Sequence, residues 1–282
     1  MDGLVSAAVE TNNINIVAWN PNGIRALFKN RSDEVQRLVK EYKPHIIIWN
    51  EIKGNESKQD EIQKQVDKVM PGFKWYWNHS DKAGRHGICI AIDPKIKVLS
   101  VDYGLNGTKK EPEGRIITLE LEKCYVVGLY VVNAGMKGCD RLKYKLDWMV
   151  QLAEHLQNLV SSSPTPKPVV AMGDWNIAPT DLDIHNPKTN AKSAGFTPEE
   201  KECFSLFKQI GWIDVYRHKY PDRRIFSFWN TKFRAREKDA GWRIDHCMVN
   251  EDSIGLLENA KCEILDNYLG SDHAPIYFSF SL

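Results

Sequence analysis

The sequence predicts an α/β protein in which two mostly antiparallel β-sheets pack face to face, with helices on their outer faces. Strand-like apolar runs recur from residue 14 to residue 280 without a linker between them. In the first and last parts of the chain, amphipathic stretches with helical spacing separate these runs. The middle of the chain is a series of short strand-like runs with little helix. This order of elements, with strands and helices first, short strands in the middle and strands again at the end, is typical of layered sheets.

Length and composition favour a single domain. The 282 residues are enough to bury a substantial core. We expect a short polar segment at residues 1–13 and one domain at residues 14–282. The Ser/Pro stretch at residues 161–168 is too short for a flexible tether and indicates a loop before a strand.

The first part of the chain reads as strand, helix, strand, helix. Residues 14–19 form a buried apolar run that ends in a Pro-Asn-Gly turn. Residues 31–41 have helical spacing, with Ser32 as the expected cap. The uninterrupted apolar run at residues 45–49 suits a strand covered on both faces. A second helix is expected at residues 56–70, before Pro-Gly.

The middle and the end of the chain supply the remaining elements. Short strands, expected as an antiparallel meander, lie at residues 73–77, 87–92, 97–101, 115–121 and 125–132. The clearest helix spans residues 140–160, and a strand begins at Val169. A polar loop at residues 178–195 precedes a helix at residues 198–209, which Thr197 and Glu200 open as a capping box. The last strands are expected at residues 241–249 and 276–280.

Charge and cysteine content limit the function classes. The 38 Lys and Arg nearly balance the 37 Asp and Glu, so any polyanion site must be a local patch. The six cysteines are scattered without CxxC or zinc-like spacing, which is typical of a reducing compartment. Residues 1–13 lack an apolar signal core, and no stretch approaches the roughly 20 apolar residues of a membrane span. We expect an intracellular monomer without a membrane, nuclear in a eukaryote and cytoplasmic otherwise.

Polar residues follow several of the predicted strands at the point where each strand ends. Any one of these carboxylates, taken alone, is more often a solvated loop acid. Strand ends in layered α/β proteins gather ligands, however, so neighbouring strands would bring the whole set to one cleft. An oxygen-rich set with one imidazole suits Mg²⁺, or Mn²⁺ in its place, better than structural zinc. The set comprises Asn20, Asn22, Glu51, Asp174, Asn176, Asp272 and His273.

This set can hydrolyse a phosphodiester without a covalent nucleophile. A divalent cation neutralises a phosphate oxygen and the leaving oxyanion, while an Asp takes a proton from the attacking water. His273 can donate to the phosphoryl oxygen. A carboxylate behind the ring raises the pKa of the imidazole, and Asp245, at the end of a strand-like run, is the candidate.

Eight motifs, in order along the chain, resemble the exonuclease III type of apurinic/apyrimidinic (AP) endonuclease. This family belongs to the endonuclease/exonuclease/phosphatase superfamily. The resemblance extends from residue 14 to the end of the chain. The motifs are Asn20-Pro-Asn-Gly-Ile-Arg-Ala26, Asn50-Glu-Ile-Lys53, Tyr130-Val-Val-Asn-Ala-Gly135, Gly173-Asp-Trp-Asn176, Asn186-Pro-Lys188, Ala194-Gly-Phe-Thr-Pro-Glu-Glu200, Gly241-Trp-Arg-Ile-Asp245 and Gly270-Ser-Asp-His-Ala-Pro275.

The resemblance implies a four-layer α/β sandwich and Mg²⁺-dependent cleavage of double-stranded DNA on the 5′ side of an abasic site. It also implies additional 3′-phosphodiesterase and 3′→5′ exonuclease activities. Glu51 matches the principal metal ligand, with Asn22 and Asp272 near it. Asp174 matches the base. Tyr130 and Asn176 match residues that contact the scissile phosphate, and His273 with Asp245 matches the His-Asp pair.

The resemblance also implies a substrate pocket and phosphate contacts. Phe228, Trp242 and Ile244 match a small apolar pocket that accepts a flipped abasic sugar. A missing base makes extrusion cheap, whereas an intact nucleotide is too bulky to enter. Without the resemblance, these aromatic residues would read as ordinary core. The expected DNA contacts are Arg25, Lys53, Asn133, Arg141, Asn190 and the segment 232–236.

Several positions depart from the family pattern, and two other functions remain open. The departures are Asn22, Asn50, Arg85, Val132 and Ser193, and they bear on substrate preference and on how tightly the DNA strand is held. The nearest alternative is another phosphoesterase of the superfamily, such as a DNase I-like nuclease or an inositol phosphatase, against which the aromatic pocket argues. The other is a DNA damage sensor without catalysis, against which the complete ligand set argues.

Overall fold

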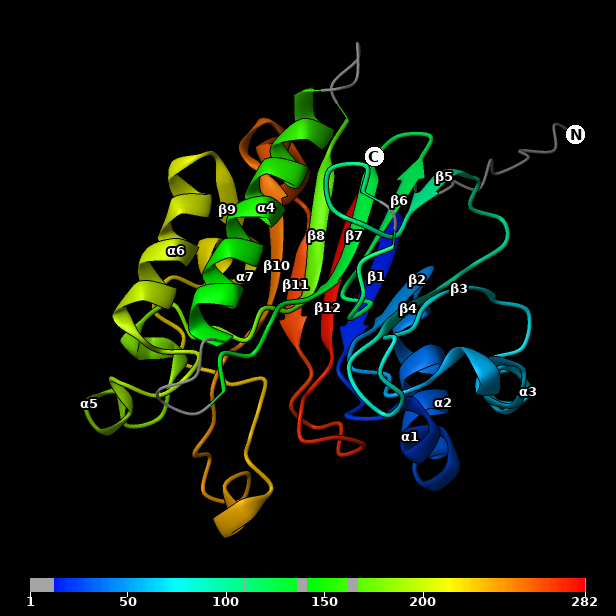
Figure 1. Ribbon diagram of the computed structural model, residues 1–282, viewed down its shortest axis with the longest axis horizontal. Coiled ribbons are helices and arrows are strands. Elements are labelled where there is room, and N and C mark those ends of the chain that lie inside the picture. The colour runs from blue at the N-terminus through cyan, green and yellow to red at the C-terminus, as the bar shows by residue number, and fades with distance from the viewer. Residues whose placement is uncertain (1–12, 109, 136–140, 162–166, 282) are drawn as a thin grey trace, which may run out of the picture.

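The computed structural model describes residues 13–108, 110–135, 141–161 and 167–281. Three sequence predictions fall at least partly outside these residues. They are the polar segment at 1–13, of which only residue 13 is described, the first residue of the helix predicted from 140, and residues 162–166 of the Ser/Pro loop. Two six-stranded sheets stack at the centre of the molecule (Figure 1). This confirms the predicted fold class.

The two sheets have the same pattern of pairing. The first has the order β11-β12-β1-β2-β4-β3 and the second β5-β6-β7-β8-β10-β9. In each sheet the one parallel pair is central, β1 with β2 and β7 with β8, and the other pairs are antiparallel. The strands are β1 (Asn13–Trp19), β2 (Ile46–Trp49), β3 (Lys74–Asn78), β4 (Ile88–Ile92), β5 (Val98–Asp102), β6 (Ile116–Leu121), β7 (Tyr125–Tyr130), β8 (Val169–Asp174), β9 (Trp212–Asp214), β10 (Asp245–Asn250), β11 (Lys261–Ile264) and β12 (Ile276–Ser281).

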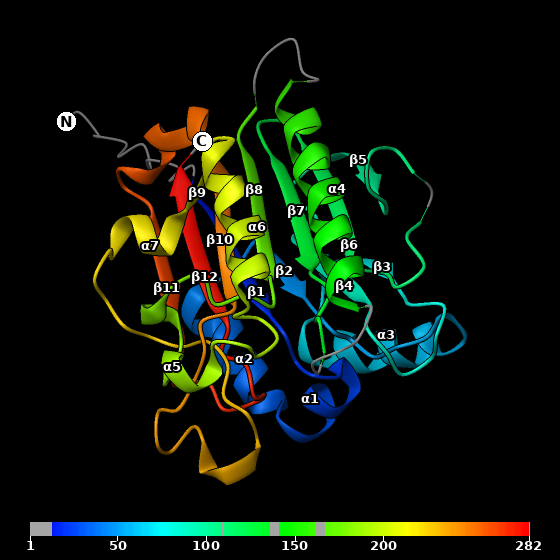
Figure 2. The same cartoon turned by 60° about the vertical axis from the view of Figure 1, so that its left-hand side comes forward.

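Helices cover both outer faces, which makes four layers (Figures 1 and 2). Helices α1–α3 pack on the first sheet, and α4 and α6 pack on the second. The helices are α1 (Ile24–Asn30), α2 (Ser32–Tyr42), α3 (Gln59–Val69), α4 (Arg141–Ser161), α5 (Pro187–Asn190), α6 (Pro198–Gln209) and α7 (Val215–Lys219), with short 3-10 turns at Glu56–Lys58, Asp181–Asp183, Lys232–Arg234 and Glu251–Leu257. No described helix is long and apolar enough to cross a membrane.

Side-chain alternation explains why the central strands are apolar on both faces. Ile16 of β1 and Ile48 of β2 point into the core between the sheets. Their neighbours Val17 and Ile47 point the other way, into the core beneath α1–α3. Successive strand residues face opposite sides, so a strand between two cores needs apolar residues throughout.

The topology brings four strand ends to one edge of the sandwich. Parallel strands need a crossover, which α1 and α2 provide between β1 and β2 and α4 provides between β7 and β8. Trp19 pairs with Trp49, and Tyr130 with Asp174, at the carboxyl ends of the two parallel pairs. Polar residues that follow these positions therefore meet between the two sheets.

Several local predictions are wrong. The expected meander is divided, because β3 and β4 join one sheet and β5–β7 the other. Ser32 is the first residue of α2 and not its cap, because the chain enters α2 from α1 through Arg31. The strand expected from residue 241 begins at Asp245, because Trp242 pairs with Phe228 outside the sheet. Helix α1 and strand β11 were not predicted.

Candidate active site

The polar strand ends converge on a cleft of about 500 Å³. Two further predicted residues, Asn20 and Asp245, are buried behind its walls. The cleft brings together most of the residues proposed from the sequence as catalytic, metal-binding or substrate-binding. They are Asn22, Glu51, Lys53, Tyr130, Asn133, Asp174, Asn176, Phe228, Trp242, Ile244, Asp272 and His273.

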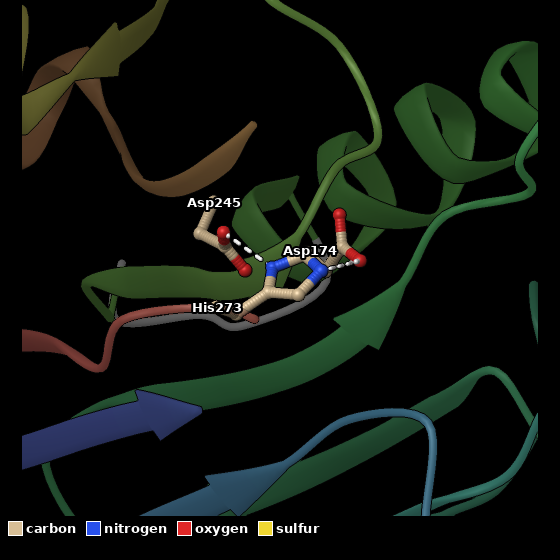
Figure 3. A group of neighbouring side chains, drawn as sticks. All are labelled: Asp174, Asp245 and His273. Carbon is tan, nitrogen blue, oxygen red and sulfur yellow. Dashed lines mark hydrogen bonds and ion pairs between the residues drawn. The ribbon is translucent and has the colours of Figure 1, made fainter. Parts of the chain in front are cut away.

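His273 lies between two carboxylates (Figure 3). Its Nδ1 is 2.9 Å from Oδ2 of Asp245, and its Nε2 is 3.9 Å from Oδ2 of Asp174. Ser227 Oγ donates to the same Asp245 oxygen at 2.7 Å and so fixes that carboxylate. All three members of the Asp174, Asp245 and His273 group are buried, and each comes from a different segment of the chain.

The charges of this group shift the pKa values of its members. Burial alone would lower the pKa of His273, but the neighbouring carboxylates, Asp245 first, raise it to about 10. Burial, together with the charge of Asp245, raises the pKa of Asp174 to about 7. The geometry therefore provides a protonated imidazole beside a carboxylate that can accept a proton near neutral pH.

Asn20 holds the carboxylates of Glu51 and Asp174 at a fixed separation. Its Nδ2 donates to Glu51 Oε2 at 3.1 Å and to Asp174 Oδ2 at 2.9 Å. Its side-chain oxygen accepts from the backbone N–H of Asn22 at 2.8 Å. The oxygen that Asn20 was predicted to offer to a metal is thus bonded to the backbone, and this arrangement makes Asn20 a bridge between two acids.

Oxygen atoms from separate segments, which could hold a cation, come together in the cleft around Glu51. The ammonium of Lys53 lies 3.1 Å from Glu51 Oε1 and donates to the side-chain oxygen of Asn22. Asn22 Nδ2 in turn donates to both oxygens of Asp272, at 3.1 and 3.2 Å. The Glu51 and Asn22 oxygens that contact the ammonium are hard ligands, which could hold a divalent cation.

Asp174, Asp245 and His273 also have possible ligand atoms within 4.8 Å of one another. In that group the Nδ1–H of His273 already donates to Asp245, and the imidazolium balances carboxylate charge. A second cation there would face a positive ring. The oxygens around Glu51 are therefore the more favourable place for a cation.

Four residues that line the cleft have a strained backbone. Asn22, Glu51, Lys53 and Asn176 all have φ between 46° and 53°, in the left-handed region. Non-glycine residues in this region are uncommon and cost of order 1–3 kcal/mol each when held there by their surroundings. Such residues cluster at ligand-binding sites, and here they turn polar side chains into the cleft.

One wall of the cleft carries hydroxyl and amide groups. Burial raises the pKa of the Tyr130 hydroxyl well above its ordinary value, and the carboxylates of Glu51 and Asp174 add to the rise. The hydroxyl therefore stays protonated. Asn133 Nδ2 donates to Asn176 Oδ1 at 2.9 Å, and the backbone N–H of Asn176 donates to Asp174 Oδ1 at 2.8 Å. We name residues Tyr130, Asn133 and Asn176 the polar wall.

The opposite side of the cleft is apolar. Phe228 and Trp242 exchange backbone hydrogen bonds of 2.8 Å, and the Phe228 ring lies 4.8 Å from the ring of His273. Ile244 and the partly exposed Phe228 and Trp242 pack in a small cluster with Ile184 and others. An apolar pocket beside the imidazole is thus present where the sequence predicted it.

Two buried ion networks support the walls, and sequence reasoning missed both. Arg243, between Trp242 and Ile244, donates to Asp183 at 2.6 Å and to Asp214 at 2.8 Å. Lys145 of α4 donates to Glu200 at 2.6 Å and to the backbone oxygen of Asn176 at 2.7 Å. The capping box at Glu200 is confirmed, and the same carboxylate also accepts from the backbone N–H of Gly195 in the cleft wall.

Three predicted DNA contacts lie outside the cleft lining. Arg25 pairs with Glu61 at 3.0 Å on the surface, and Asn190 donates to the backbone oxygens of His185 and Asn186. Arg141 donates to the backbone oxygen of Asn133 at 2.8 Å.

Arg236, in the predicted basic segment 232–236, is committed within the protein. Its guanidinium donates to the backbone oxygens of Asp266, Tyr268 and Ser271 and lies over the ring of Trp229. These contacts hold the loop before Asp272 against the segment 232–236.

Comparison with known proteins agrees with this architecture. The chain is 34% identical to an exodeoxyribonuclease of Bacillus subtilis, covering 93% of this chain and 97% of that protein. It is also 34% identical to a DNA-(apurinic or apyrimidinic site) endonuclease of Dictyostelium discoideum, covering 98% of this chain and 73% of that one. The solved AP endonuclease from Archaeoglobus fulgidus matches with a TM-score of 0.79 and 26% identity over 95% of this chain and all of that chain.

The recognition made from the sequence motifs is therefore confirmed. Residues 17–273, which include every cleft residue named above, match one family along their whole length. On this basis the chain belongs to the endonuclease/exonuclease/phosphatase family.

Proposed function

We propose that this protein is a DNA repair nuclease that hydrolyses the phosphodiester on the 5′ side of an abasic site in double-stranded DNA, with Mg²⁺ as its cation and Mn²⁺ as a substitute. One observation carries the proposal. Glu51 and Asp174, from different sheets, share a cleft with a protonated imidazole and a small apolar pocket. The similarity to a DNA-(apurinic or apyrimidinic site) endonuclease supports it.

In the proposed mechanism, each residue type has a role that follows from its surroundings. Glu51, with Asn22 and Asp272 near it, would hold a cation, which would neutralise a phosphate oxygen and the leaving oxyanion. Asp174 takes a proton from the attacking water, for which its raised pKa suits it. His273 donates a hydrogen bond to a phosphate oxygen, and Asp245 holds the ring in place at 2.9 Å. The protonated Tyr130 hydroxyl orients the phosphate.

The apolar pocket gives the proposed substrate its specificity. An abasic nucleotide has lost its stacking and pairing, so turning it out of the duplex costs little. Phe228, Trp242 and Ile244 offer its sugar an apolar surface beside His273. For an intact nucleotide, the pocket would also have to accommodate the base, which makes it too bulky to enter. The same cleft would accept a 3′-terminal block or nucleotide, which is the basis for proposed 3′-phosphodiesterase and 3′→5′ exonuclease activities.

The decisive experiment compares nicking of an abasic duplex and a matched intact duplex, with Mg²⁺ and with chelator. We expect the wild type to cut the abasic strand only with Mg²⁺ and to leave the intact duplex largely uncut. Asp174→Asn removes the proposed general base, and Glu51→Gln removes the proposed metal ligand. We expect each variant to nick the abasic duplex roughly 10²–10⁴-fold more slowly than the wild type.

Glu122→Gln is the matched control, because Glu122 is an exposed acid whose partner Lys97 also lies outside the cleft. Near-normal nicking in Asp174→Asn or Glu51→Gln would overturn the site. Equal cutting of the two duplexes would instead indicate a general nuclease.

A further inference from the structure

Behind the polar wall lies a cluster of charged and polar groups that has no role in the mechanism above. It is centred on the carboxylate of Glu113, whose side chain is 23% exposed. We name it the Glu113 cluster. Its members are His86, Glu113, Arg115, Arg141 and Tyr144.

Four groups converge on this single carboxylate, two of them from helix α4. Glu113 Oε2 accepts from Arg115 Nε at 2.7 Å and from the Tyr144 hydroxyl at 3.2 Å. Oε1 lies 3.3 Å from His86 Nε2 and 3.7 Å from an Arg141 nitrogen. The hydrogen bond with His86 and the charge of Arg115 outweigh burial and hold the pKa of Glu113 well below its usual range. The cluster therefore has a permanent negative centre.

Arg115 connects this centre to Tyr130. Its side chain is fully buried, and its guanidinium lies 4.8 Å from the centre of the Tyr130 ring. Its NH1 donates to the backbone oxygen of Tyr130 at 3.0 Å, and the backbone N–H of Tyr130 donates to the oxygen of Arg115 at 2.8 Å. Three contacts thus join one arginine to one cleft residue. Without Glu113 the buried guanidinium would lose its closest anionic partner.

Two more connections extend from Glu113 to the cleft. Arg141 donates from Nε to the backbone oxygen of Asn133 at 2.8 Å. His86 accepts from Arg115 at 3.1 Å through Nδ1, and its backbone oxygen accepts from the N–H of Lys53 at 2.9 Å. An arginine can only donate, so Nδ1 accepts and Nε2–H faces Glu113.

We propose that Glu113 is a positioning residue for the polar wall, holding Arg115 and Arg141 so that they fix Tyr130 and Asn133 in the cleft that they share with Glu51. The role rests on the proposed function, because the wall is there to grip a phosphate. Glu113 itself does not line the cleft. Its effect on hydrolysis is therefore transmitted through the wall.

The first test compares Glu113→Gln with Glu111→Gln. Glu111 lies two residues away and is also largely buried, but its carboxylate accepts from the backbone N–H of Arg115. Misplacing a positioning group by about 1 Å costs roughly 100-fold, and we expect that loss of kcat/KM on abasic duplex in Glu113→Gln. Glu111→Gln should change it little. Equal effects of the two variants would overturn the proposal.

A double-mutant cycle separates positioning from general destabilisation. If Glu113 acts through Tyr130, the combined loss in Glu113→Gln with Tyr130→Phe is smaller than the product of the single losses. The cycle with Phe228→Ala, on the other side of the cleft, should be multiplicative. A multiplicative cycle with Tyr130 overturns the proposal. Should Glu113→Gln fail to fold, Glu113→Asp serves, because it keeps the charge but withdraws it from Arg115.

A crystal structure of the variant supplies a test that needs no activity. We expect the Tyr130 ring and the Asn133 side chain to be displaced or disordered, with Asp174 and His273 unmoved. An unmoved Tyr130 overturns the positioning role. If the wild type fails to nick abasic DNA, the proposed function falls, and this structure still decides whether Glu113 sets the position of the wall.

Discussion

His273 is held in its charged form by a balance between burial and two carboxylates. Burial would lower its pKa, but Asp245 and Asp174 raise it from 6.5 to about 10. The protonated ring therefore stabilises the fold fully below pH 6.5, and this contribution is lost as pH rises through about 10. At pH 8 the ring is a cation, the form that can donate to a phosphate oxygen.

Replacing Asp245 should shift two ionisations in the same direction. Asp245 raises the pKa of both His273 and Asp174, so Asp245→Asn should lower both. Because these groups are coupled, the shift belongs to the pair. We expect both limbs of the pH profile of kcat/KM to move to lower pH, and activity at pH 8 to fall by roughly 100-fold.

Ring NMR titration of His273 checks the assignment directly. Asp266→Asn is the control, because Asp266 is an exposed acid on the segment that leads to His273. An Asp245→Asn variant with an unshifted His273 titration would contradict the electrostatic account. A uniform loss of rate at every pH would do so too.

Residue positions in the site were predictable from the sequence, but hydrogen-bond directions were not. Glu51, Asp174 and His273 each flank a strand, so their convergence followed from the pattern of apolar runs. The orientation of Asn20 depends on which acids lie beside it in three dimensions. The sequence likewise gives no sign of the three backbone oxygens that accept hydrogen bonds from Arg236.

At the scale of elements, α4 and α6 are joined by a buried ion pair. Lys145 and Glu200 are both fully buried, and their atoms lie 2.6 Å apart. Lys145 also holds the backbone of Asn176, and Glu200 holds that of Gly195. The pair therefore connects α4 and α6 to the backbone of two cleft residues, Asn176 and Gly195.

Removing only the lysine should be costly. Lys145→Met leaves Glu200 buried without its cation, and breaking a buried pair in this way costs about 3–5 kcal/mol of unfolding free energy. The double variant Lys145→Met with Glu200→Gln should recover part of the loss, because no uncompensated charge remains. Urea unfolding measures both.

Lys143→Met on the same helix is the matched control. Lys143 pairs with Asp147 at 2.6 Å, but both side chains are exposed. Such a surface pair contributes at most about 0.5 kcal/mol. A Lys145→Met variant as stable as Lys143→Met would contradict the importance of the buried pair.

The sequence predicted long elements better than short ones. Helix α6 was predicted with its capping box because the signals are local. Helix α1 is stabilised instead by burial of Ile24, Leu27 and Phe28 beneath the first sheet, which is a tertiary effect. The burial of Lys145 was not predicted for a similar reason, since a lysine on a long helix ordinarily faces solvent.

At the scale of the whole molecule, the two sheets are topologically equivalent halves. In each sheet, two strands that pair in antiparallel fashion lie on either side of the central parallel pair. The cleft lies where the carboxyl ends of both pairs meet. The sequence could not assign β3–β7 to their sheets, because apolar alternation looks the same whichever sheet a strand joins.

The near-zero net charge makes DNA binding depend on a few local cations. The formal charge is +1, so the molecule as a whole offers little attraction to a polyanion. Lys53 lies in the cleft, and exposed Arg85, Lys192 and Lys232 lie on segments that supply or contact cleft residues. These cations are the ones expected to meet phosphates.

Salt dependence tests this local arrangement. Each phosphate contact contributes a slope of about 0.9 to the fall of log affinity with log salt, so the four cations named above predict a slope of roughly 3.6 for abasic duplex in chelator. Lys192→Gln and Lys232→Gln should each lower the slope by about 1. Lys97→Gln is the control, because Lys97 pairs with Glu122 before β7, at the end of the sheet away from the cleft. A flat curve for the wild type, or an equal loss of slope in Lys97→Gln, would mean that binding does not depend on cations beside the cleft.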